Sequence, residues 1–524
     1  MNKEYDAIVI GGGLAGLTSA AYLCRYGYRT LLCEKSDKTG GLVNTFRHQG
    51  FAFDAGIRAF ENSGILLPML KGLGLEMEFA RNPVSIGIGA QWTRLTSRES
   101  LKSYADMLAG IFPENAPDIG AITREIQKVM GYMDVLYGID NPLFLENRKD
   151  REYLLKTLLP WLLAYQVNIR KASRLSQPVV AYLKRFTDNQ ALTDMIAQHF
   201  FKDTPTFFAL SYFGLYLDYC YPKGGTGMLA QLVTDYVRRA GGEILTDTAV
   251  TRVDADHRQV QTAGGAIYHY QKLVWAADQK TLYAAAGGQR SSRIDNRRRL
   301  AEEGRGGDSI LSLFMGIHLD PDYFQARCGA HAFYTPSAQG LSSLQGWQAA
   351  MAENRIYEWI GQYLERTTYE ISCPVLRDPA LAPEGKTGLI VSTLMDYSLV
   401  KHLSDAGGYE PLKEYCKRKI IEVLETSAFP GLSERIEFTL CATPLTIERE
   451  TGNAHGAITG WAFTNDPLPA ESRFKKITNA IKTPIRNVYQ CGQWTFSPSG
   501  LPVSILTGKL AADAIHKALK GTDG

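Results

Sequence analysis

The sequence of 524 residues lacks the patterns that mark several common kinds of site. Its eight cysteines are scattered without a CxxC pair, and its nine histidines include no HExxH motif. We therefore expect no structural zinc, no disulfide framework and no other metal site. This use of cysteine is typical of a reducing compartment.

The chain also lacks an excess of charge of one sign. Its net charge is +3, which creates no field strong enough to indicate a nucleic-acid partner. The densest basic stretch, "RSSRIDNRRRLAEEGR" at 290–305, also contains acidic residues. It therefore indicates a solvated loop and helix, with anionic lipid headgroups as the alternative partner.

No apolar run is long enough to span a membrane. The two most apolar stretches, "LLKTLLPWLLAYQV" at 154–167 and "TFFALSYFGLYLDYCY" at 206–221, are too short or too interrupted. Only "MNKEY" precedes the first motif, so no signal peptide is expected. We expect a cytoplasmic protein and leave peripheral contact with a membrane open.

What the sequence does contain is a nucleotide-binding pattern in "YDAIVIGGGLAGLTSAAYLCRYGYRTLLCEK" at 5–35. An apolar run predicts a buried parallel strand, and a helix rich in Ala and Leu precedes a second strand that ends at Glu34. Gly11 permits the tight turn, Gly13 allows close approach of a pyrophosphate, and Gly16 lets the helix pack near the strand. Glu34 is placed to accept hydrogen bonds from a ribose diol, which disfavours NADP and leaves FAD and NAD.

The next segments favour FAD. "GGLVNTF" at 40–46 and "GFAFDAGIRAF" at 50–60 add a two-glycine step and a D-x-G motif. This layout resembles the FAD-binding half of the flavin amine oxidase and phytoene desaturase superfamily. The resemblance implies that Val250 lies beside the adenine and that Asp278, after the strand "KLVWA", lies at the mouth of the cofactor site. It also implies that the last helix, in "SGLPVSILTGKLAADAI" at 499–515, starts at the flavin.

Nearly the whole chain resembles the phytoene desaturase, carotenoid isomerase and retinol saturase family. Four further stretches carry this resemblance: "YPKGGTGMLAQLV" at 221–233, "SCPVLRDPALAPEGKTGLIV" at 372–391, "ATPLTIERETGNAHGAITGW" at 442–461 and "SPSGLPV" at 497–503. The resemblance implies an FAD site formed by Gly11, Gly13, Leu14, Ala15, Gly16, Glu34, Lys35, Gly40, Gly41, Leu42, Gly56, Ile57, Arg58, Val250, Asp278, Gly492, Leu501, Pro502 and Val503.

Three residues near the expected flavin are candidates for catalysis. Arg58 occupies a position where relatives often carry a small residue; an ion pair with Glu61 or another carboxylate is the structural alternative. Tyr221 belongs to the Y-P-K-G-G turn and has a structural alternative there. Trp494 either contributes an indole hydrogen bond or simply packs. Asp278 is also expected to cap the helix that begins in "DQKTLY".

We therefore expect an α/β chain with a Rossmann-like, GR2-type FAD-binding domain, a second sheet-containing substrate domain and a helical cap. The FAD-binding domain is predicted to be discontinuous, over 1–80, 222–300 and 480–524. Apolar residues at helical spacing place the cap at 104–216. The second sheet, with its flanking helices, is predicted over 306–480.

The function expected from the resemblance is that of an FAD-dependent oxidoreductase acting on carbon–carbon bonds of an apolar isoprenoid or other lipid. Desaturation, saturation and redox-neutral isomerisation all occur in this family. An amine oxidase-like flavoenzyme and a non-enzymatic flavin- or lipid-binding protein are the alternatives. No second dinucleotide fingerprint appears, so direct reduction by NADPH is not expected; the electron partner and the oligomeric state stay open.

Overall fold

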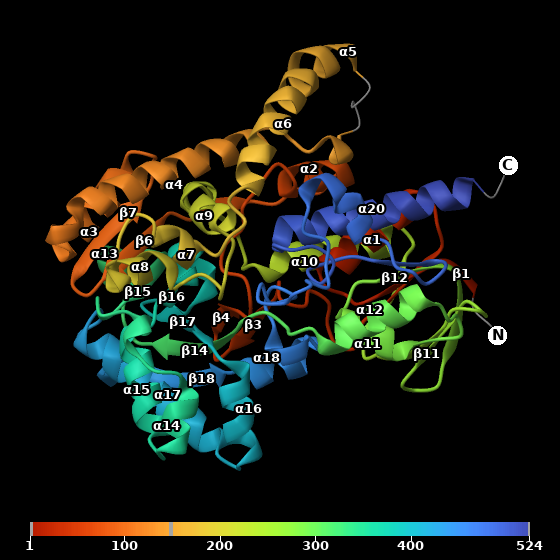
Figure 1. Cartoon of the computed structure of the whole chain (residues 1–524). Coiled ribbons are helices and arrows are strands. Elements are labelled where there is room, and N and C mark those ends of the chain that lie inside the picture. Colours follow the sequence, from red (N-terminus) through yellow and green to blue (C-terminus); the bar gives the residue numbers. More distant parts are fainter. Residues whose placement is uncertain (1–3, 146–149, 522–524) are drawn as a thin grey trace.

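Two β-sheets organise the chain, which we describe from a computed structural model covering residues 4–145 and 150–521 (Figure 1). Within these ranges the first sheet has eight strands. Seven follow the order β13 (Ala286–Gly287), β10 (Val250–Asp254), β11 (Gln259–Thr262), β12 (Ile267–Trp275), β1 (Glu4–Ile10), β2 (Thr30–Cys33) and β9 (Glu243–Leu245). The eighth, β19 (Val488–Gln490), pairs with β12 in parallel. The first sheet therefore joins both ends of the chain.

The strand β1 is apolar throughout its centre because both of its faces are covered. Ala7 and Val9 pack in a core with α1 (Leu14–Arg25), α10 (Gly227–Arg239) and α20 (Leu501–Lys520). Ile8 and Ile10 pack in a separate core with α11 (Gln279–Ala285) and α12 (Ser292–Glu303). β1 is parallel to both neighbours, β2 and β12, as expected for a parallel sheet buried between helices. The predicted Rossmann-like arrangement is confirmed.

The second sheet has seven strands in the described ranges and is mostly antiparallel. Its order is β18 (Ile436–Ala442), β14 (Ser309–Ile317), β17 (Thr387–Met395), β16 (Tyr369–Ser372), β15 (His331–Thr335), β6 (Val84–Ile88) and β7 (Gln91–Leu95). β6 and β7 lie outside the range 306–480 that was predicted for this sheet. β6 joins it through parallel pairing with β15, a contact between distant segments that no local pattern reveals.

Helices cover one face of the second sheet, and the other face packs against the hairpin formed by β3 (Thr45–His48) and β4 (Phe51–Asp54). The covering helices are α13 (Pro321–Arg327), α14 (Trp347–Ala352), α15 (Ile356–Arg366), α16 (Tyr397–Asp405) and α17 (Tyr409–Thr426). Phe314 and Ile390 on the opposite face pack against Phe51 and Phe53 of β4, which pairs with β3. This face lies next to the segments that follow β2.

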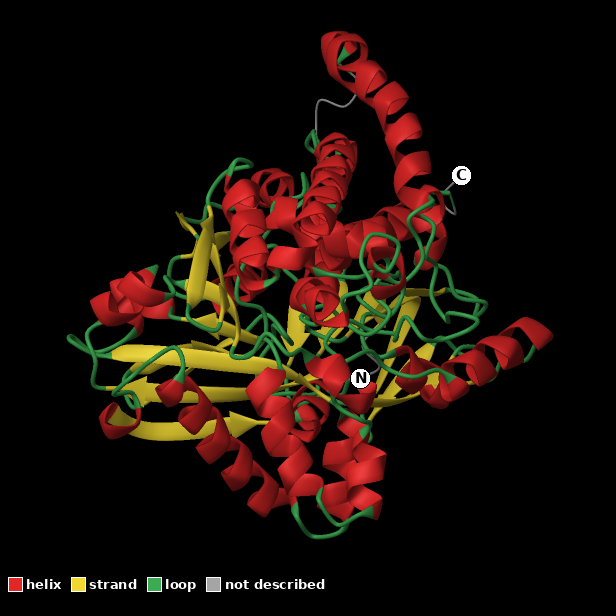
Figure 2. Cartoon of the chain, turned by 60° about the vertical axis from the view of Figure 1, so that its left-hand side comes forward, coloured by secondary structure: helices red, strands yellow, loops and turns green. Residues whose placement is uncertain are grey.

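A group of helices packs on the second sheet, in the region where the cap was predicted. These helices are α3 (Ser100–Ile111), α4 (Ala116–Leu136), α5 (Arg151–Tyr153), the π-helix η3 (Leu154–Leu158), α6 (Leu159–Ser173), α7 (Val179–Leu183), α8 (Gln190–Ala197) and α9 (Thr206–Asp218). α4 packs on both α6 and α9. In the views of Figures 1 and 2, α5 and the start of α6 project away from the rest of the molecule. None of the described helices combines the length and the apolar character that crossing a bilayer would require.

Short elements complete the connections between these layers. They are α2 (Leu66–Leu73), β5 (Phe79–Arg81), β8 (Cys220–Pro222), α18 (Pro444–Thr451) and α19 (Ile477–Ala480). β5 and β8 form a two-stranded antiparallel pair. This pair places the Y-P-K-G-G turn, which starts at Tyr221, beside β5, the strand that directly precedes β6 of the second sheet in the chain.

A buried carboxylate, that of Asp54, fixes how the hairpin β3–β4 meets the Y-P-K-G-G turn. Its Oδ1 accepts hydrogen bonds from Thr45 Oγ1 at 2.9 Å, Thr226 N at 2.8 Å and Thr226 Oγ1 at 2.9 Å. Its Oδ2 accepts one from Tyr221 Oη at 2.7 Å. Hydrogen bonds to a buried charged group contribute more than neutral ones, so this carboxylate is a main link between the two segments.

Asp54→Ala should therefore lower the free energy of unfolding by about 3 kcal/mol or more, because several buried donors lose their acceptor together. Tyr221→Phe removes only one of these donors and should cost about 1–2 kcal/mol. Urea unfolding of both variants, followed by circular dichroism, measures the difference. Equal losses in the two variants would contradict the central place of Asp54.

Candidate functional site

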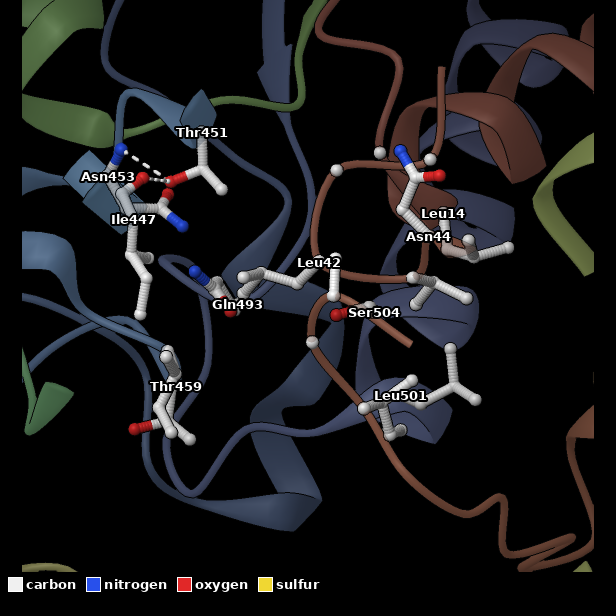
Figure 3. A pocket seen from close by; sticks show the side chains of 18 of the residues that line it. Leu14, Leu42, Asn44, Ile447, Thr451, Asn453, Thr459, Gln493, Leu501 and Ser504 are labelled. Carbon is white, nitrogen blue, oxygen red and sulfur yellow. Dashed lines mark hydrogen bonds between the residues drawn. The ribbon is translucent and has the colours of Figure 1, made fainter. Parts of the chain in front are cut away.

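One large cavity, of about 860 Å³, runs between the two sheets and the helical region. Its lining comes from the first turn of α1, from the segments after β2 and β4, from α9, from the second sheet and from the loop before α20. Figure 3 shows a part of it, with Leu14 and Leu42 on one side and Ile447 and Thr459 on the other. The cavity therefore joins segments from almost the whole length of the chain.

The glycine turn at the start of α1 leaves an open cradle at this cavity. Gly11 has φ +102°, a conformation that favours glycine, and a Cβ on Gly16 would lie 1.9 Å from the carbonyl oxygen of Gly11. A Cβ on Gly13, in contrast, would meet nothing within 4 Å. Gly13, Leu14 and Ala15 line the cavity, and Gly16 lies behind them, where it allows the helix to contact the strand.

This cradle has the properties of an anion site. The helix α1 begins at Leu14, and the first backbone N–H bonded within it is that of Leu17, which donates to Gly13 O. The N–H groups before Leu17 thus have no acceptor within the helix, and the helix dipole adds positive potential. Gly40, Gly41 and Leu42 line the same region, and Gly40 forms a β-bridge with Gly13.

Glu34 and its neighbours form one end of the cavity. Its Oε2 accepts from Gly12 N at 2.6 Å and its Oε1 from Ser36 N at 2.8 Å, so the carboxylate is fixed with its remaining lone pairs available. Lys35 and Val250 also line this end. Lys35 Nζ donates to Arg449 O at 2.9 Å. This is the end at which the sequence predicted a ribose and an adenine.

The segments at the C-terminal end of the chain line a further part of the cavity. Gly492, Gln493 and Trp494 follow β19, and Leu501 and Ser504 come from the first turn of α20. Pro502 and Val503 were also predicted here but do not line the cavity. The spacing of three residues between Leu501 and Ser504 sets one helical face, and the two residues between them lie on other faces.

Trp494 and Asp278 have defined structural partners. Trp494 Nε1 donates to Asn453 Oδ1 at 3.0 Å, and its ring meets that of Trp461 edge to face at 4.8 Å. Asp278 caps α11, as predicted, by accepting from Lys280 N at 2.6 Å, and it also accepts from Ala454 N at 2.7 Å. Burial raises the pKa of Asp278 to about 6. Both residues line the cavity, whereas Trp461 does not.

Tyr221 is not among the residues that line the cavity. It is fully buried, its hydroxyl donates to Asp54, and the guanidinium of Arg377 lies 3.8 Å from its ring centroid. These contacts favour the structural alternative for Tyr221 over the catalytic one.

Arg58 and Ile57 line the cavity, together with Gly56. Arg58 Nη1 donates to the carbonyl oxygens of Asp54 and Gly56, and Nη2 donates to Ser392 Oγ at 3.2 Å. Its Nε has no hydrogen-bond partner among the residues of the described ranges. Burial lowers the pKa of Arg58, and the charges of Glu370 and Asp54 oppose that effect. The structural alternative was an ion pair with Glu61 or another carboxylate, but the hydrogen bonds of Arg58 go to two carbonyl oxygens and one hydroxyl.

Glu370 lies in the cavity within a buried polar network that sequence reasoning did not find. His331 Nε2 lies 3.0 Å from Glu370 Oε1, and His331 Nδ1 lies 3.1 Å from Asn82 Nδ2. Because an amide nitrogen only donates, this pattern assigns the proton of a neutral His331 to Nε2. Arg377 Nη1 donates to Asn82 Oδ1 at 3.1 Å and to Arg58 O at 3.2 Å, which connects the network to the Arg58 loop.

The network keeps Glu370 ionised. Burial acts to raise its pKa, but the hydrogen bond from His331 and the charges of Arg58 and Arg377 outweigh burial, so the pKa lies below its ordinary value. The only sequence signal was the alternation of "TYEIS", which predicts a strand but not a charged partner for its glutamate.

Glu61 is a second carboxyl group in the same cavity, and its environment is the opposite one. Its Oε1 lies 4.0 Å from where a Cβ on Gly500 would be, beside the start of α20. Its side chain is partly buried and lines the cavity, and burial raises its pKa to about 7. Its charge in turn adds to burial in raising the pKa values of Tyr137 and Tyr212. Glu370 and Glu61 therefore differ near neutral pH, where Glu370 is ionised and Glu61 is half protonated, although both line the same cavity.

One wall of the cavity is aromatic. Phe208, Tyr212 and Tyr216 of α9 follow one another at spacings of four residues and all line the cavity, as does Phe333. His199 lies beside Tyr216, with its Nε2 3.1 Å from Tyr216 Oη, and burial lowers the pKa of His199 to about 3. A neutral histidine and aromatic rings form a lining that suits an apolar ligand.

Comparison with known families and structures identifies relatives over the full chain. The family model described as "Flavin containing amine oxidoreductase" matches residues 14–298, more than half of the chain. Three curated relatives align over most of their own length. They are all-trans-retinol 13,14-reductase of Danio rerio (24% identity; 94% of this chain, 82% of the relative), prolycopene isomerase of Arabidopsis thaliana (23%; 98%, 82%) and phytoene desaturase (lycopene-forming) of Pseudescherichia vulneris (24%; 98%, 99%).

Solved structures show the same fold at lower identity. An oxidoreductase from Methanosarcina mazei matches with a TM-score of 0.60 at 14% identity and covers 98% of this chain and 99% of its own. A putrescine oxidase variant matches with a TM-score of 0.62 at 12% identity, with coverages of 98% and 99%. At these identities the match shows the fold alone.

The pKa of Glu61 generates a prediction for stability. Because this carboxyl binds its proton more tightly in the folded chain, its contribution to stability is complete below its ordinary pKa of 4.5 and is lost as the pH rises through about 7. Relative to Glu61→Gln, the wild type should lose up to about 3 kcal/mol of stability between acidic and mildly alkaline pH. Urea unfolding at several pH values measures this difference, and a constant difference would contradict the raised pKa.

Proposed function

The chain belongs to the flavin-containing amine oxidoreductase family, and from this premise we propose that it is an FAD-dependent oxidoreductase that acts on carbon–carbon bonds of an apolar, isoprenoid-like substrate. The observation that carries the proposal is the single cavity. It connects the nucleotide-type glycine turn with an aromatic wall and two carboxyl groups of different protonation.

The residues along the cavity fit FAD. The open cradle at Gly13, with the N–H groups at the start of α1, suits the pyrophosphate, and Glu34 suits the ribose next to it. Gly492 and Leu501, near the N-terminus of α20, would hold the isoalloxazine end, with Arg58 also in reach of the cavity. When bound, FAD supplies transfer of a hydride to or from carbon.

The proposal of an apolar substrate rests on the wall formed by α9 and on the relatives. That wall presents Phe208, Tyr212 and Tyr216, and the nearby His199 is neutral. The three curated relatives are named for reactions on retinol, prolycopene and phytoene. An apolar chain in such a cavity displaces water from the reacting carbon atoms.

The two carboxyl groups suit different tasks. Glu61, with a pKa of about 7, can give a proton from Oε1 or Oε2 to a substrate carbon, or take one from it, at neutral pH. Glu370, paired with His331 and near Arg58, stays ionised and balances positive charge in the cavity. A hydride and a proton together saturate one double bond, and their removal creates one.

The amine oxidase-like alternative has less support from the cavity. A cationic amine is typically held between aromatic faces, and Trp461 and Trp494 are the two residues of the sequence that suggest such a cage. In the structure these rings meet edge to face, and Trp461 does not line the cavity. Release of peroxide with amines but with no polyene would nevertheless favour that alternative over the present proposal.

Gly13→Glu tests the flavin site. The backbone at Gly13 is extended, with φ −68°, and a side chain there projects into open space, so the fold should tolerate the change. The carboxylate would occupy and repel the pyrophosphate position, and we expect loss of more than about 90% of bound flavin. Gly131→Glu in α4 is the matched control, since its Cβ also meets nothing within 4 Å and it lies away from the cavity.

Flavin released by heat denaturation and measured by fluorescence gives the flavin content of both variants. Circular dichroism checks that each variant is folded. A folded Gly13→Glu protein that keeps its flavin would contradict the proposed cofactor site.

The substrate class is tested by mass spectrometry of apolar lipids incubated anaerobically with the protein, with oxidised and with chemically reduced flavin side by side. A loss of two hydrogens identifies desaturation, a gain of two identifies saturation, and a changed retention time at unchanged mass identifies isomerisation. No change in any lipid, in either flavin state, would contradict the apolar-substrate proposal. A flavin that no donor reduces would instead support a binding protein.

Glu61→Gln should lower kcat by about 10²-fold or more at neutral pH while flavin content stays unchanged, because it removes the proton that Glu61 exchanges. If the reaction is a saturation, wild-type activity should fall as the pH rises above about 7; for a desaturation it should fall below about 7. This limb of the pH profile should be absent in Glu61→Gln. A variant with unchanged kcat and the same profile would exclude Glu61 from proton transfer.

A further inference from the structure

The helical segment formed by α5, η3 and α6 exposes an unusual amount of apolar surface. Of the nine large apolar side chains that are well exposed in the described ranges, five belong to this segment, here called the arm (Arg151–Ser173). They are Leu155 (66% exposed), Leu159, Leu162, Leu163 (66%) and Val167. Contiguous exposed apolar surface on a soluble protein usually marks a contact site.

These side chains form a stripe along the arm. Leu155, Leu159, Leu163 and Val167 follow one another at spacings of four residues, which places them on one face of a helix. The opposite face attaches the arm to the body: Trp161 Nε1 donates to Val135 O of α4 at 2.7 Å, and Ile169 and Ala172 are buried. The stripe is therefore not the surface through which the arm packs on its own chain.

The charges of the arm are complementary to an anionic surface. Arg151, Lys156, Arg170 and Lys171 of the arm are exposed, and so is Arg174 directly after it. Lys156 pairs with Glu152, but no acidic residue occurs in the sequence between Glu152 and Asp188. A second copy of the chain would bring the same basic groups into proximity, whereas acidic phospholipids would neutralise them.

The attached end of the arm is close to the cavity. α6 packs on α4, α4 packs on α9, and α9 supplies the aromatic wall. Tyr137, which ends α4, is near enough to both Glu61 in the cavity and Tyr165 on the arm that, after burial, their charges raise its pKa. In Figures 1 and 2 the free end of the arm points away from the body.

We propose that the arm docks this protein on an anionic lipid bilayer, with the leucine stripe among the acyl chains and the basic residues at the headgroups. A purpose in taking up an apolar substrate rests on the proposed function, but the contact itself does not. The arm lies on the surface in this proposal and does not span it.

Flotation of the purified full-length protein with lipid vesicles tests the proposal. Vesicles of phosphatidylcholine alone are compared with vesicles that also contain phosphatidylglycerol. The wild type should float with the mixed vesicles, bind less to the neutral ones, and release in part at high salt, since salt screens only the headgroup contribution. The combined variant Leu155→Glu, Leu159→Glu and Leu163→Glu should reduce the bound fraction by about tenfold or more.

Ile267→Glu is the matched control, because Ile267 is also exposed (43%) but lies on β12, far along the chain from the arm. It should float like the wild type. Flavin content and circular dichroism of each variant show that it is folded and keeps its cofactor site. Gly13→Glu should show the opposite pattern, with less flavin and unchanged flotation, so failures of the two proposals are distinguishable.

Three results would overturn the lipid proposal. The first is a wild type that stays in the lipid-free fraction with both kinds of vesicle, and the second is an arm variant that floats as the wild type does. The third is a wild type that sediments as a dimer in analytical ultracentrifugation without binding vesicles, while the arm variant sediments as a monomer. That outcome would make the stripe an interface between copies.

Discussion

The carboxylate of Asp54 is the interaction on which the geometry of the cavity depends. It lies where the hairpin β3–β4, the Y-P-K-G-G turn and the face of the second sheet meet. Three of its hydrogen bonds, from Tyr221 and Thr226, hold the hairpin to the turn, and the fourth, from Thr45, lies within the hairpin. The backbone that follows it carries Gly56, Arg58 and Glu61 into the cavity. Buried hydrogen bonds to a charge are directional and costly to break. They therefore fix the position of the backbone from which these three residues extend into the cavity.

The position of Arg58 near Asp54 also influences which carboxyl groups of the cavity are ionised. Arg58 uses its Nη1 on the carbonyls of Asp54 and Gly56, which keeps the guanidinium near the residue that anchors the loop. Its positive charge, with that of Arg377, lowers the pKa of Glu370. No positive charge among the described residues lowers the pKa of Glu61 in this way, and Glu61 keeps its proton up to about pH 7. Two identical side chains thus acquire different protonation states through their neighbours alone.

The sequence predicted the parts of this molecule that depend on local patterns. The turn at Gly11 and Gly13, the acid at Glu34 and the helix cap at Asp278 all need residue types at fixed spacing, and each lies at the cavity. The pairing of β6 with β15 was missed because it depends on contacts between distant segments. Glu370 was missed for the same reason: its partner His331 lies on the neighbouring strand, in a register that no spacing reveals.

The cap was predicted from apolar residues at helical spacing, and the same pattern has two different meanings in the folded chain. In α9 the aromatic residues turn inward and line the cavity, whereas in the arm the leucines turn outward. Exposing apolar surface to water costs about 25 cal/mol of free energy for each Å², which adds up to a large cost for a long polyene. A cavity reached directly from a bilayer avoids that step. If the substrate is apolar and the arm contacts a bilayer, as proposed, the outward leucines of the arm and the inward rings of α9 would together keep the substrate out of water; both lie on helices that pack on α4.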